Sequence, residues 1–359
     1  MIKVLGLALY GPLAASNRYR LGQYISGLAE LGIELRVCSL LSDDYLRLKF
    51  SGDAMPLTAL VKAGVDRFSD LLGASSYDLA IVHCELFPLL PGWLERRLLR
   101  KPYIYDFDDA FYLKYRSGRL GLARPILGNK FDAIMRGARA VTAGNATLRG
   151  YAESFNANTH SLPTVVDIRR YRPGAADANA AFTVGWIGSP STAPYLHELI
   201  EPLSVLGTEA EVKLMVVGGK APVVPNVSVE EVEWREETEI DLINRFDVGV
   251  MPLPDSDWAR GKCAFKLIQY MACGVPVIAS PVGANNDVVN PESGLLAATS
   301  EQWLAALRIL RDQPELRAAM GQAGRQRVVE HYSLQRNLPV LAKIIFDAAG
   351  RVGPATLGD

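Results

Sequence analysis

Two lysines and a glutamine stand close together in GKCAFKLIQYMACGVPVIASPVG, residues 261–283. Lys262, Lys266 and Gln269 follow one another at spacings of four and three, so on a helix they share one side. Such a helix would begin at the carboxyl end of a strand, where free N–H groups and the helix dipole attract an anion. The pattern predicts a phosphate site at the two lysines, with Gln269 able to hydrogen-bond a sugar hydroxyl. The alternative is that both lysines only extend into solvent.

Three aspartates follow an apolar run in YIYDFDDAFY. Asp106, Asp108 and Asp109 at the end of a buried strand are costly unless they bind something or are hydrogen-bonded. They could orient acceptor hydroxyls, act as a base, or hold a divalent metal through an Asp-x-Asp arrangement. Capping of the next helix is the alternative, and for Asp109 it is equally well supported. We predict Asp108 as the functional residue.

Other residues that follow strands carry weaker signals. His83 ends YDLAIVH at the same edge as the aspartates, where it either lines a binding cleft or is satisfied by the backbone. Gly188 and Ser189 follow a strand in GWIGSPSTAPYLHELI, and glycine would let a phosphate approach the backbone. Arg18 in GPLAASNRYR, with Ser16 and Arg20 beside it, could contact an anionic ligand from the opposite wall, although arginines there are commonly only solvated.

Several site types find no support in the sequence. The four histidines are too far apart for a metal motif, and no HExxH occurs. There is no GxSxG elbow, no GxGxxG and no GxxxxGK[ST]. The four cysteines are scattered and predict free thiols in a reducing compartment.

Apolar runs that predict strands alternate with helical patterns along the whole chain. The predicted strands are IKVLGLALY, IELRVCSLL, YDLAIVHCE, KPYIYDFD, ARAVTAG, FTVGWIGS, VKLMVVGG, FDVGVMPL and VPVIASPVG. The predicted helices between them include RLGQYISGLAELG, YLHELIEPLSVLG and EQWLAALRILRDQ. Continuous apolar strands indicate parallel sheets covered by helices on both faces. The run PTVVDIRRYRPGAADANAAF is the best candidate for a linker, so we predict two doubly wound α/β domains, 1–165 and 166–334, facing across a cleft.

The composition is that of an ordinary globular protein. The chain has 359 residues, of which 49% are hydrophobic and 21% charged, which excludes a disordered protein. A formal net charge of −1 argues against a dedicated nucleic-acid binder. MIKVLGLALYGPLAA loosely resembles a signal peptide, but glycine and proline interrupt its apolar run and a polar helical segment follows. We therefore expect a cytoplasmic protein, with peripheral contact to a membrane surface as a further option.

Several motifs together resemble a known family. The C-terminal half contains MACGVPVIAS with its preceding helix, and AGRQRVVEHYSL. The N-terminal half contains GPLAASNRYR, DFDDAFY and LPTVVDIRRYRP. With these motifs the sequence resembles the retaining glycosyltransferases of family 4, in particular a subgroup of bacterial polysaccharide synthesis. The resemblance implies the GT-B fold of two Rossmann-like domains, the first binding the acceptor and the second the nucleotide sugar. It also implies that a final helix, about 335–359, packs back on the first domain.

The resemblance implies roles for individual residues, with two departures. The family usually has two glutamates eight positions apart before this MACG segment, and they fall here on Gly261 and Gln269, so both acids are missing. An amide at Gln269 could partly keep the contact with the donor ribose. Asp108 falls where many members have a histidine near the transferred sugar.

The predicted site residues form three groups. Asp108 and Lys266 are predicted to be catalytic. The predicted donor-binding residues are Gly188, Ser189, Lys262, Lys266, Gln269, Gly283, Asn285 and Asn286. The predicted acceptor or cleft residues are Arg18, His83, Asp106 and Asp109.

The implied activity is transfer of a sugar from a nucleotide diphosphate to an acceptor hydroxyl with retention of configuration. Lysines and helix N–H groups would stabilise the leaving diphosphate, so no metal and no cofactor besides the donor are expected. The donor base is left open. Between Arg96 and Arg139 the chain is rich in Arg and Lys with apolar residues interspersed, which suits the inner membrane surface or a lipid-linked acceptor. A solvated basic face is the alternative.

Four other interpretations remain open at the level of sequence. The first is a nucleotide-sugar epimerase of similar architecture, for which the aspartates would serve as acid and base. The second is a metal-dependent transferase of the single-domain type, against which the complete second domain argues. A two-domain binding protein without catalysis is the third. A family member that has lost activity with its glutamates is the fourth.

Overall fold

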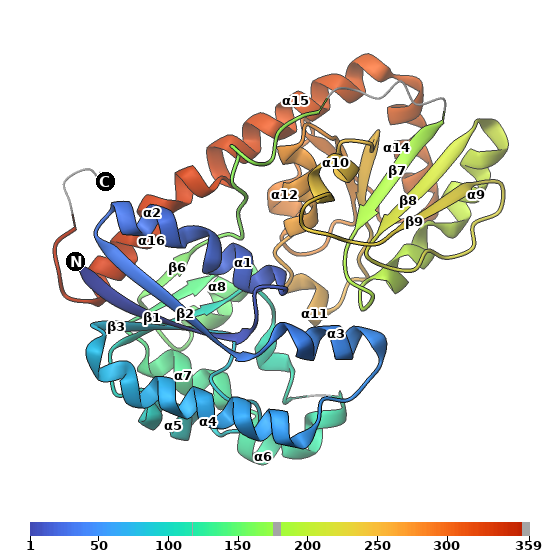
Figure 1. Ribbon diagram of the computed structural model, residues 1–359. Helices are drawn as coiled ribbons and strands as arrows, with labels where there is room; N and C mark the ends of the chain where they lie inside the picture. The colour runs from blue at the N-terminus through green and yellow to red at the C-terminus, as the bar shows by residue number, and fades with distance from the viewer. Residues whose placement is uncertain (117, 175–180, 354–359) are drawn as a thin grey trace. The chain divides into compact units, whose positions relative to one another are not determined.

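The computed structural model describes residues 1–116, 118–174 and 181–353, and divides into two compact units (Figure 1). Unit 1 comprises Met1–Val165, Gly261–Cys263 and the segment from Leu334, and unit 2 comprises Val166–Arg260 and Ala264–Ser333. Residues 175–180 of the predicted linker and 354–359 of the predicted final helix lie outside the described residues. The two units are described one at a time.

Unit 1 is built on a six-stranded sheet with the strand order β2-β1-β3-β4-β5-β6, in which neighbouring strands run parallel. Its strands are β1 (Ile2–Tyr10), β2 (Ile33–Leu41), β3 (Leu79–His83), β4 (Tyr103–Phe107), β5 (Ala140–Ala143) and β6 (Thr159–Ser161). Its α-helices are α1 (Ala15–Arg20), α2 (Ile25–Glu30), α3 (Asp43–Ser51), α4 (Leu57–Gly73), α5 (Gly92–Leu98), α6 (Arg124–Leu127), α7 (Lys130–Gly137), α8 (Ala146–Glu153) and α16 (Leu334–Ala348). Short 3₁₀ turns are η1 (Gly22–Tyr24), η2 (Ala74–Ser76), η3 (Phe111–Leu113) and η4 (Gly118–Ala123).

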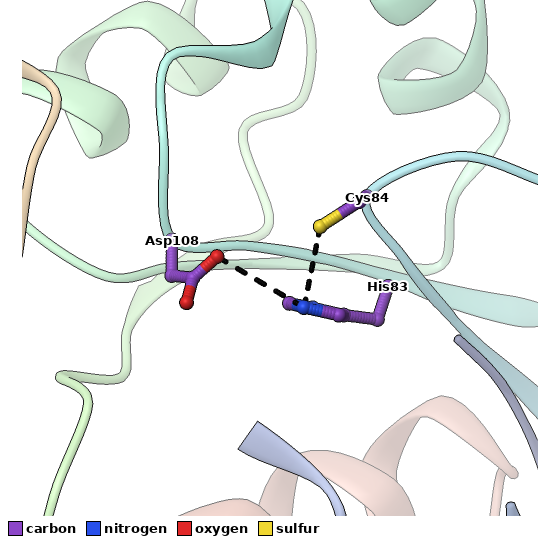
Figure 2. A group of neighbouring side chains, drawn as sticks. All are labelled: His83, Cys84 and Asp108. Atoms are coloured by element: carbon purple, nitrogen blue, oxygen red, sulfur yellow. Dashed lines mark hydrogen bonds and ion pairs between the residues drawn. The ribbon is translucent and has the colours of Figure 1, made fainter. Parts of the chain in front are cut away.

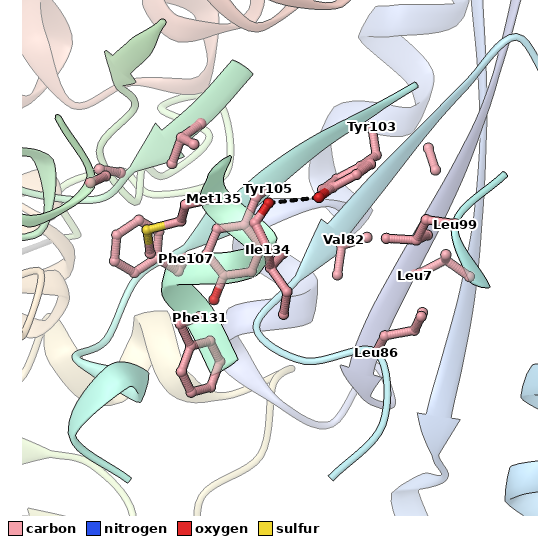
Figure 3. Close-up of a cluster of buried hydrophobic side chains, with 14 of the residues drawn as sticks. Leu7, Val82, Leu86, Leu99, Tyr103, Tyr105, Phe107, Phe131, Ile134 and Met135 are labelled. Atoms are coloured by element: carbon pink, nitrogen blue, oxygen red, sulfur yellow. Dashed lines mark hydrogen bonds between the residues drawn. The ribbon is translucent and has the colours of Figure 1, made fainter. Parts of the chain in front are cut away.

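The two faces of this sheet carry separate cores because successive side chains of a strand point to opposite sides. Ile81 and Ile104 face a core to which α2 and α16 contribute. Val82 and Tyr105 face the other core, which α4, α5, α7 and α8 cover. Figure 3 shows the aromatic part of this second core, with Phe131 of α7 against the sheet. A parallel sheet with both faces buried explains the continuous apolar strands in the sequence.

Unit 2 has a second six-stranded parallel sheet, with the order β12-β11-β10-β7-β8-β9. Its strands are β7 (Phe182–Ile187), β8 (Val212–Val217), β9 (Ser228–Val232), β10 (Val248–Met251), β11 (Val277–Ala279) and β12 (Gly294–Leu296). Its helices are η5 (Ala193–Leu199), α9 (Ile200–Glu209), α10 (Glu239–Ile243), α11 (Asp257–Arg260), α12 (Phe265–Ala272), α13 (Asn285–Val288), α14 (Ser300–Asp312) and α15 (Pro314–His331). One core joins β7, β8 and β10 to α9 and α14, whereas α12 packs against α15.

The predicted class, two Rossmann-like α/β domains, is confirmed by these two parallel sheets with flanking helices. Every predicted strand is present, but β6, β9 and β12 were not predicted. Two of them have only three residues, and β9 is an edge strand that is mostly exposed, so none has a continuous apolar run. The helix predicted at residues 20–32 is broken into the end of α1, η1 and α2.

Among the described residues, no helix combines the length and the apolar character that crossing a membrane requires.

Candidate active site

A row of polar residues crosses the carboxyl end of the sheet of unit 1. His83 of β3 is in register with Asp106 of β4, which is in register with Thr142 of β5. The three side chains lie on the face that carries Ile81 and Ile104, because each is an even number of residues from an apolar residue of that face. The sequence predicted that His83 and Asp106 share an edge, and the structure brings them together.

Asp106 accepts hydrogen bonds from three side chains and is only 2% exposed. Arg20 of α1 holds both of its carboxylate oxygens, Thr142 donates to Oδ1 at 2.6 Å, and His83 Nδ1 lies 2.7 Å from Oδ2. Burial opposes its ionisation, but the charge of Arg20 and these hydrogen bonds hold the pKa of Asp106 far below the ordinary value.

Two predictions are corrected by this pairing. Arg20 was expected to contact an anionic ligand, but its guanidinium is buried against Asp106 and the carbonyl of Leu162. An Asp-x-Asp metal site would need Asp106 as a ligand, and its oxygens are already engaged by Arg20, Thr142 and His83. Asp106 instead orients His83.

His83 turns its other nitrogen toward two residues at the end of the strands, as Figure 2 shows. Its Nε2 lies 3.2 Å from Cys84 Sγ and 3.9 Å from Asp108 Oδ1. His83 and Cys84 are buried, while Asp108 is partly exposed just beyond β4. Burial, followed by the charge of Asp108, raises the pKa of the Cys84 thiol. The sequence analysis selected His83 and Asp108 as candidate site residues. It did not select Cys84, which it treated as one of four scattered free thiols.

Asp109 lies next to Lys262, and neither residue has the local structure that the sequence predicted. Ala110, not Asp109, occupies the position that caps η3. The Lys262 ammonium is 4.0 Å from Asp109 Oδ1, and Lys262 precedes α12, which begins only at Phe265. The shared helix side predicted for Lys262 and Lys266 is therefore wrong.

The reason is that another side chain holds the segment Gly261–Cys263 in unit 1. Asn145 Nδ2 donates to the carbonyls of Gly261 and Lys262 at 3.0 and 2.9 Å. The same residue caps α8, since its Oδ1 accepts from Leu148 N at 2.8 Å. Sequence reasoning missed Asn145, although an asparagine after a strand and before a helix is a capping signal that could have drawn attention to it.

Arg18 of α1 is oriented by the backbone of the loop that precedes this helix. Its Nη1 donates to the carbonyls of Pro12 and Leu13, each at 2.8 Å. It lies after β1, at the carboxyl end of that strand, as the sequence predicted.

In unit 2, Lys266 lies beside the end of β7. Its ammonium is 5.5 Å from the centre of the Trp186 ring, and the side chain passes close to Gly188. A Cβ at Gly188 would lie 2.7 Å from Lys266 Cε and 2.5 Å from the Trp186 ring, so only glycine fits there. Lys266 is in the first turn of α12, and the residue at the N-cap, Ala264, has no side-chain acceptor for the first N–H groups.

Gln269 is buried in a chain of hydrogen bonds. It is 5% exposed, and its Nε2 donates to the Tyr171 hydroxyl at 2.9 Å. Tyr171 in turn donates to Glu239, which also accepts from Trp234 Nε1 at 2.9 Å. One of the donors of the Gln269 amide is therefore engaged by Tyr171, and the contact with a sugar hydroxyl stays a prediction.

The remaining predicted donor residues differ in their surroundings. Gly283 has φ 53° and lies against Arg260, whose carbonyl oxygen would be 2.5 Å from a Cβ. Asn285 is buried and donates to Ser280 O at 2.9 Å, whereas Asn286 is exposed. Ser189 follows Gly188, with its hydroxyl 2.8 Å from that of Ser191.

A second buried polar cluster joins three elements of unit 1. Lys130 of α7 lies 2.8 Å from Glu85, which follows β3, and 3.0 Å from Glu95 of α5, and all three side chains are inaccessible to solvent. Glu85 also accepts from Tyr115 at 2.7 Å. Burial raises the pKa of Glu95 to about 7, against the opposing charge of Lys130.

Comparisons with known proteins relate unit 2 to glycosyltransferases. Residues 181–313, which lie in unit 2, match the family model described as Glycosyl transferases group 1. A curated relative is the GDP-mannose-dependent monoacylated alpha-(1-6)-phosphatidylinositol monomannoside mannosyltransferase of Corynebacterium glutamicum. It is 28% identical over 216 residues, which are 52% of this chain and 56% of the relative. The match thus spans just over half of the relative's length.

Solved structures share the fold of the whole chain. A sucrose-phosphate synthase of Thermosynechococcus elongatus superimposes with a TM-score of 0.69 at 16% identity, covering 97% of this chain and 99% of the other. The Anabaena protein HepE, solved with UDP and glucose, gives a TM-score of 0.71 at 14% identity and covers 97% and 100%. The chain therefore has the predicted GT-B fold.

Proposed function

We propose that this protein transfers a sugar from a nucleotide diphosphate to an acceptor hydroxyl with retention of configuration. The group 1 match supports the reaction class. The observation that carries the proposal is the position of Lys266, in the first turn of α12 and beside the strand-end glycine Gly188. There its ammonium adds to the positive end of the helix, which suits a diphosphate.

The leaving diphosphate gains negative charge as the sugar bond breaks. A preorganised cation and helix N–H groups stabilise that charge more strongly in the transition state than in the bound donor. In this proposal Lys266 supplies the cation and Asp108 of unit 1 acts on the side of the acceptor and sugar. Transfer requires no metal and no further cofactor.

The donor base is left to experiment. The Corynebacterium relative is named for GDP-mannose, and HepE was solved with UDP and glucose. Thermal unfolding of the purified protein should be followed with UDP, GDP, ADP, dTDP, CMP and NADH, with and without Mg²⁺. A ligand at roughly 100 times its dissociation constant adds about 2.7 kcal/mol of stability, which is easily seen. We expect one diphosphate to stabilise the protein in EDTA as well as in Mg²⁺.

The direct test is Lys266→Ala, assayed for transfer and for stabilisation by that diphosphate. Loss of a charge-assisted hydrogen bond costs about 1.5–3 kcal/mol, which weakens binding roughly 10- to 100-fold. Lys213→Ala is the matched control, since this lysine of β8 pairs with Glu230 at 3.4 Å and should leave transfer unchanged. Full transfer by Lys266→Ala would refute the central role of this residue. Release of an epimerised donor instead of a glycosylated acceptor would favour the epimerase.

We further propose that the acceptor is lipid-linked, in cell-surface glycan synthesis, and that a cytoplasmic enzyme meets it at the membrane. The predicted basic region 96–139 supports this only in part. Arg96 and Arg97 are exposed on α5, but Lys130 is buried with two glutamates and Arg116 pairs with Asp132 at 2.9 Å. Residue 117 and the side chains of 118–120 lie outside the described part of this region.

An apolar stripe on α4 gives the stronger support for membrane contact. Its members recur at spacings of three and four, and each is between 48% and 75% exposed: Leu57, Val61, Val65, Phe68 and Leu72. Such a stripe suits the boundary between headgroups and acyl chains. We expect co-sedimentation with anionic phospholipid vesicles that Val61→Glu with Val65→Glu abolishes. Val205→Glu, at an exposed valine of α9, is the control. Equal binding of all three proteins would refute this proposal.

A further inference from the structure

Three ligand atoms of unit 1 converge at the carboxyl ends of β3 and β4 (Figure 2). His83 Nε2, Cys84 Sγ and a carboxylate oxygen of Asp108 all lie within 4.8 Å of one another. Nε2 is 3.2 Å from the sulfur and 3.9 Å from Asp108 Oδ1. In a tetrahedral zinc site with bonds of about 2.0–2.3 Å, ligand atoms are roughly 3.3–3.8 Å apart. The Asp108 oxygen is therefore slightly farther away than in a bound site, and Asp108, which would have to move closer, is partly exposed.

Asp106 prepares His83 for a ligand at Nε2. Its carboxylate accepts from Arg20 and Thr142, so it is ionised and His83 Nδ1 must be the donor in their 2.7 Å contact. In the neutral imidazole this leaves a lone pair on Nε2, facing Cys84 and Asp108. Metal-ligating histidines almost always donate their other N–H to a carboxylate, a backbone carbonyl or water, which fixes the tautomer and the ring, and here a carboxylate takes that role.

The backbone of Cys84 is held in a conformation that non-glycine residues rarely adopt. Its φ is 65°, a backbone conformation that persists only where the surroundings enforce it. Two contacts do so: Cys84 N donates to Asp106 O at 3.0 Å, and Cys84 O accepts from the Tyr105 hydroxyl at 2.9 Å. The strained turn places the thiol against the imidazole.

We propose that His83, Cys84 and Asp108 bind one thiophilic divalent metal ion, of which Zn²⁺ is the chemical type. A nitrogen, a sulfur and a carboxylate oxygen suit zinc and disfavour Mg²⁺ and Ca²⁺, which prefer oxygen ligands alone. On binding, the Cys84 thiol loses its proton to solvent and the metal takes the place of that proton between sulfur and Nε2. Three protein ligands leave a fourth position for water, which reaches the site along Asp108.

The expected consequence for catalysis is inhibition, and this part rests on the proposed function. Transfer is proposed to need no metal but to need Asp108. A metal that engages the Asp108 carboxylate removes it from the acceptor side. Zinc should therefore slow transfer reversibly, and EDTA should restore it.

Metal binding can be measured without any donor or acceptor. The full-length protein, freed of metal with EDTA and dialysed, is titrated with Co²⁺, whose bond to a thiolate gives a charge-transfer absorption. Zn²⁺ then displaces the Co²⁺ and reports the zinc affinity. In weak buffer, zinc binding should release about one proton per ion from Cys84.

Two variants of Cys84 separate binding from folding. Cys84→Ala removes the ligand, and Cys84→Gly does so with a residue that favours positive φ, so at least this variant should fold. Cys38→Ala is the matched control, a half-buried thiol on β2. We expect one equivalent of Co²⁺ with a thiolate band in the wild type and in Cys38→Ala. Both Cys84 variants should lose the band and bind zinc at least tenfold more weakly.

The outcomes are distinct. Absence of a thiolate band in the wild type, or a band that survives in Cys84→Gly, would overturn the metal site. A band that depends on Cys84, together with transfer that zinc does not affect, would keep the metal site and remove Asp108 from the proposed reaction. Loss of transfer in Lys266→Ala has no bearing on the cobalt spectrum, so the two proposals fail independently.

Discussion

At the scale of single residues, unit 1 is organised by one ionised aspartate. Asp106 is engaged by Arg20, Thr142 and His83, and its removal would leave a buried guanidinium without its counter-charge. The position of Asp106 in the register of the sheet, next to His83 and Thr142, is what makes these contacts possible.

Asp106→Asn should therefore be strongly destabilising. Breaking a buried ion pair at one partner costs about 3–5 kcal/mol, because the other charge stays buried. Asp255→Asn is the control, since Asp255 pairs with Arg260 at 2.7 Å on the surface, where solvent screens the pair and its loss should change stability little. Urea unfolding followed by circular dichroism measures both. Equal costs in the two variants would show that the Arg20 pair is no stronger than a surface pair.

Gln269→Glu tests whether the missing acid of the family could simply be restored. The new carboxylate would be buried beside Tyr171, whose hydroxyl already donates to Glu239, and the donor in the 2.9 Å bond would be lost. We expect a loss of about 1–3 kcal/mol in unfolding free energy. Gln302→Glu, at the exposed start of α14, is the control. Tighter binding of the diphosphate without loss of stability would mean that the acid and the amide are interchangeable here.

Sequence reasoning placed single residues correctly where strand position alone decides their surroundings, whereas their functional roles stay predictions. His83 and Asp106 follow from two strands that end at one edge, and Asp108 from the residue just beyond. The sequence could not reveal that the Cys84 thiol lies beside His83, because this position depends on a positive φ that hydrogen bonds with Tyr105 and Asp106 enforce. Arg20 was misassigned because spacing along a helix does not reveal a partner that lies far away in sequence.

At the scale of elements, close packing in unit 2 depends on particular glycines. Gly321 of α15 faces the end of α12, where a Cβ would lie 2.0 Å from the carbonyl oxygen of Gly274. Gly150 of α8, in contrast, has open space around its missing Cβ. Helix propensity favours alanine over glycine at both positions, but only at Gly321 would the added methyl group clash. Comparing the two Gly→Ala substitutions therefore distinguishes the effect of helix propensity from the effect of packing.

Gly321→Ala should destabilise unit 2, whereas Gly150→Ala should stabilise unit 1 by up to about 1 kcal/mol, the propensity difference between the two residues. The clash at Gly321 meets backbone, which cannot rotate away, so we expect a loss of about 1–3 kcal/mol. Differential scanning calorimetry measures both changes. If Gly321→Ala gained stability, α15 would have to be free to move away from α12.

The cluster of Lys130, Glu85 and Glu95 ties α5 and α7 to the end of β3 and makes stability depend on pH. The pKa of Glu95 rises on folding from its ordinary value of 4.5 to about 7. The folded state then keeps a proton that the unfolded chain releases, so this contribution is complete below the unfolded pKa and is lost as pH rises through about 7. The pKa of Glu95 is raised because burial disfavours the charged carboxylate, and the positive charge of Lys130 offsets this effect only in part.

Glu95→Gln should remove this dependence. Each unit of pKa difference is worth about 1.4 kcal/mol, so relative to wild type the variant should gain stability between about pH 5 and about pH 8. Unfolding free energies at both pH values measure the change, and Glu153→Gln, at an exposed i,i+4 pair of α8, is the control. If the difference in unfolding free energy between Glu95→Gln and wild type did not change with pH, the Glu95 carboxylate would have its ordinary pKa in the folded protein.

Element prediction succeeded where a pattern is long and continuous. The apolar runs of β1, β2, β7 and β8 are specific to buried parallel strands, whereas β6 and β12 are too short to have a pattern. The helix containing Lys266 was predicted, but its start was not, because Asn145 from a distant strand end holds Gly261 and Lys262 in another unit. Contacts of this kind are not encoded in local periodicity.

At the scale of the whole molecule, the chain forms two compact units. Unit 1 is assembled from both ends of the sequence. Leu341, Ile344 and Ile345 of α16 pack in the core that contains Ile2 and Val4 of β1. The stability of unit 1 should therefore depend on residues more than three hundred positions after its first strand.

Ile345→Ala should lower the stability of unit 1 by about 2–5 kcal/mol, since the side chain is fully buried. Calorimetry in the presence of the stabilising diphosphate distinguishes the unfolding transitions of the two units, because that ligand should raise only the unfolding temperature of unit 2. Ile309→Ala, at an exposed position of α14, is the control for unit 2. A shift of both transitions by Ile345→Ala would show that the units unfold as one.

The assembly of unit 1 from both ends also sets an order of events on the ribosome. All residues of unit 2 have been translated once Ser333 is joined, before α16 exists. Unit 2 can therefore complete its core during translation, while the Ile2 and Val4 face of the earlier-made sheet still lacks the part of its cover that α16 supplies. The part of the protein that is synthesised first is thus the part that finishes folding last, and until then it is the part that a chaperone would need to shield.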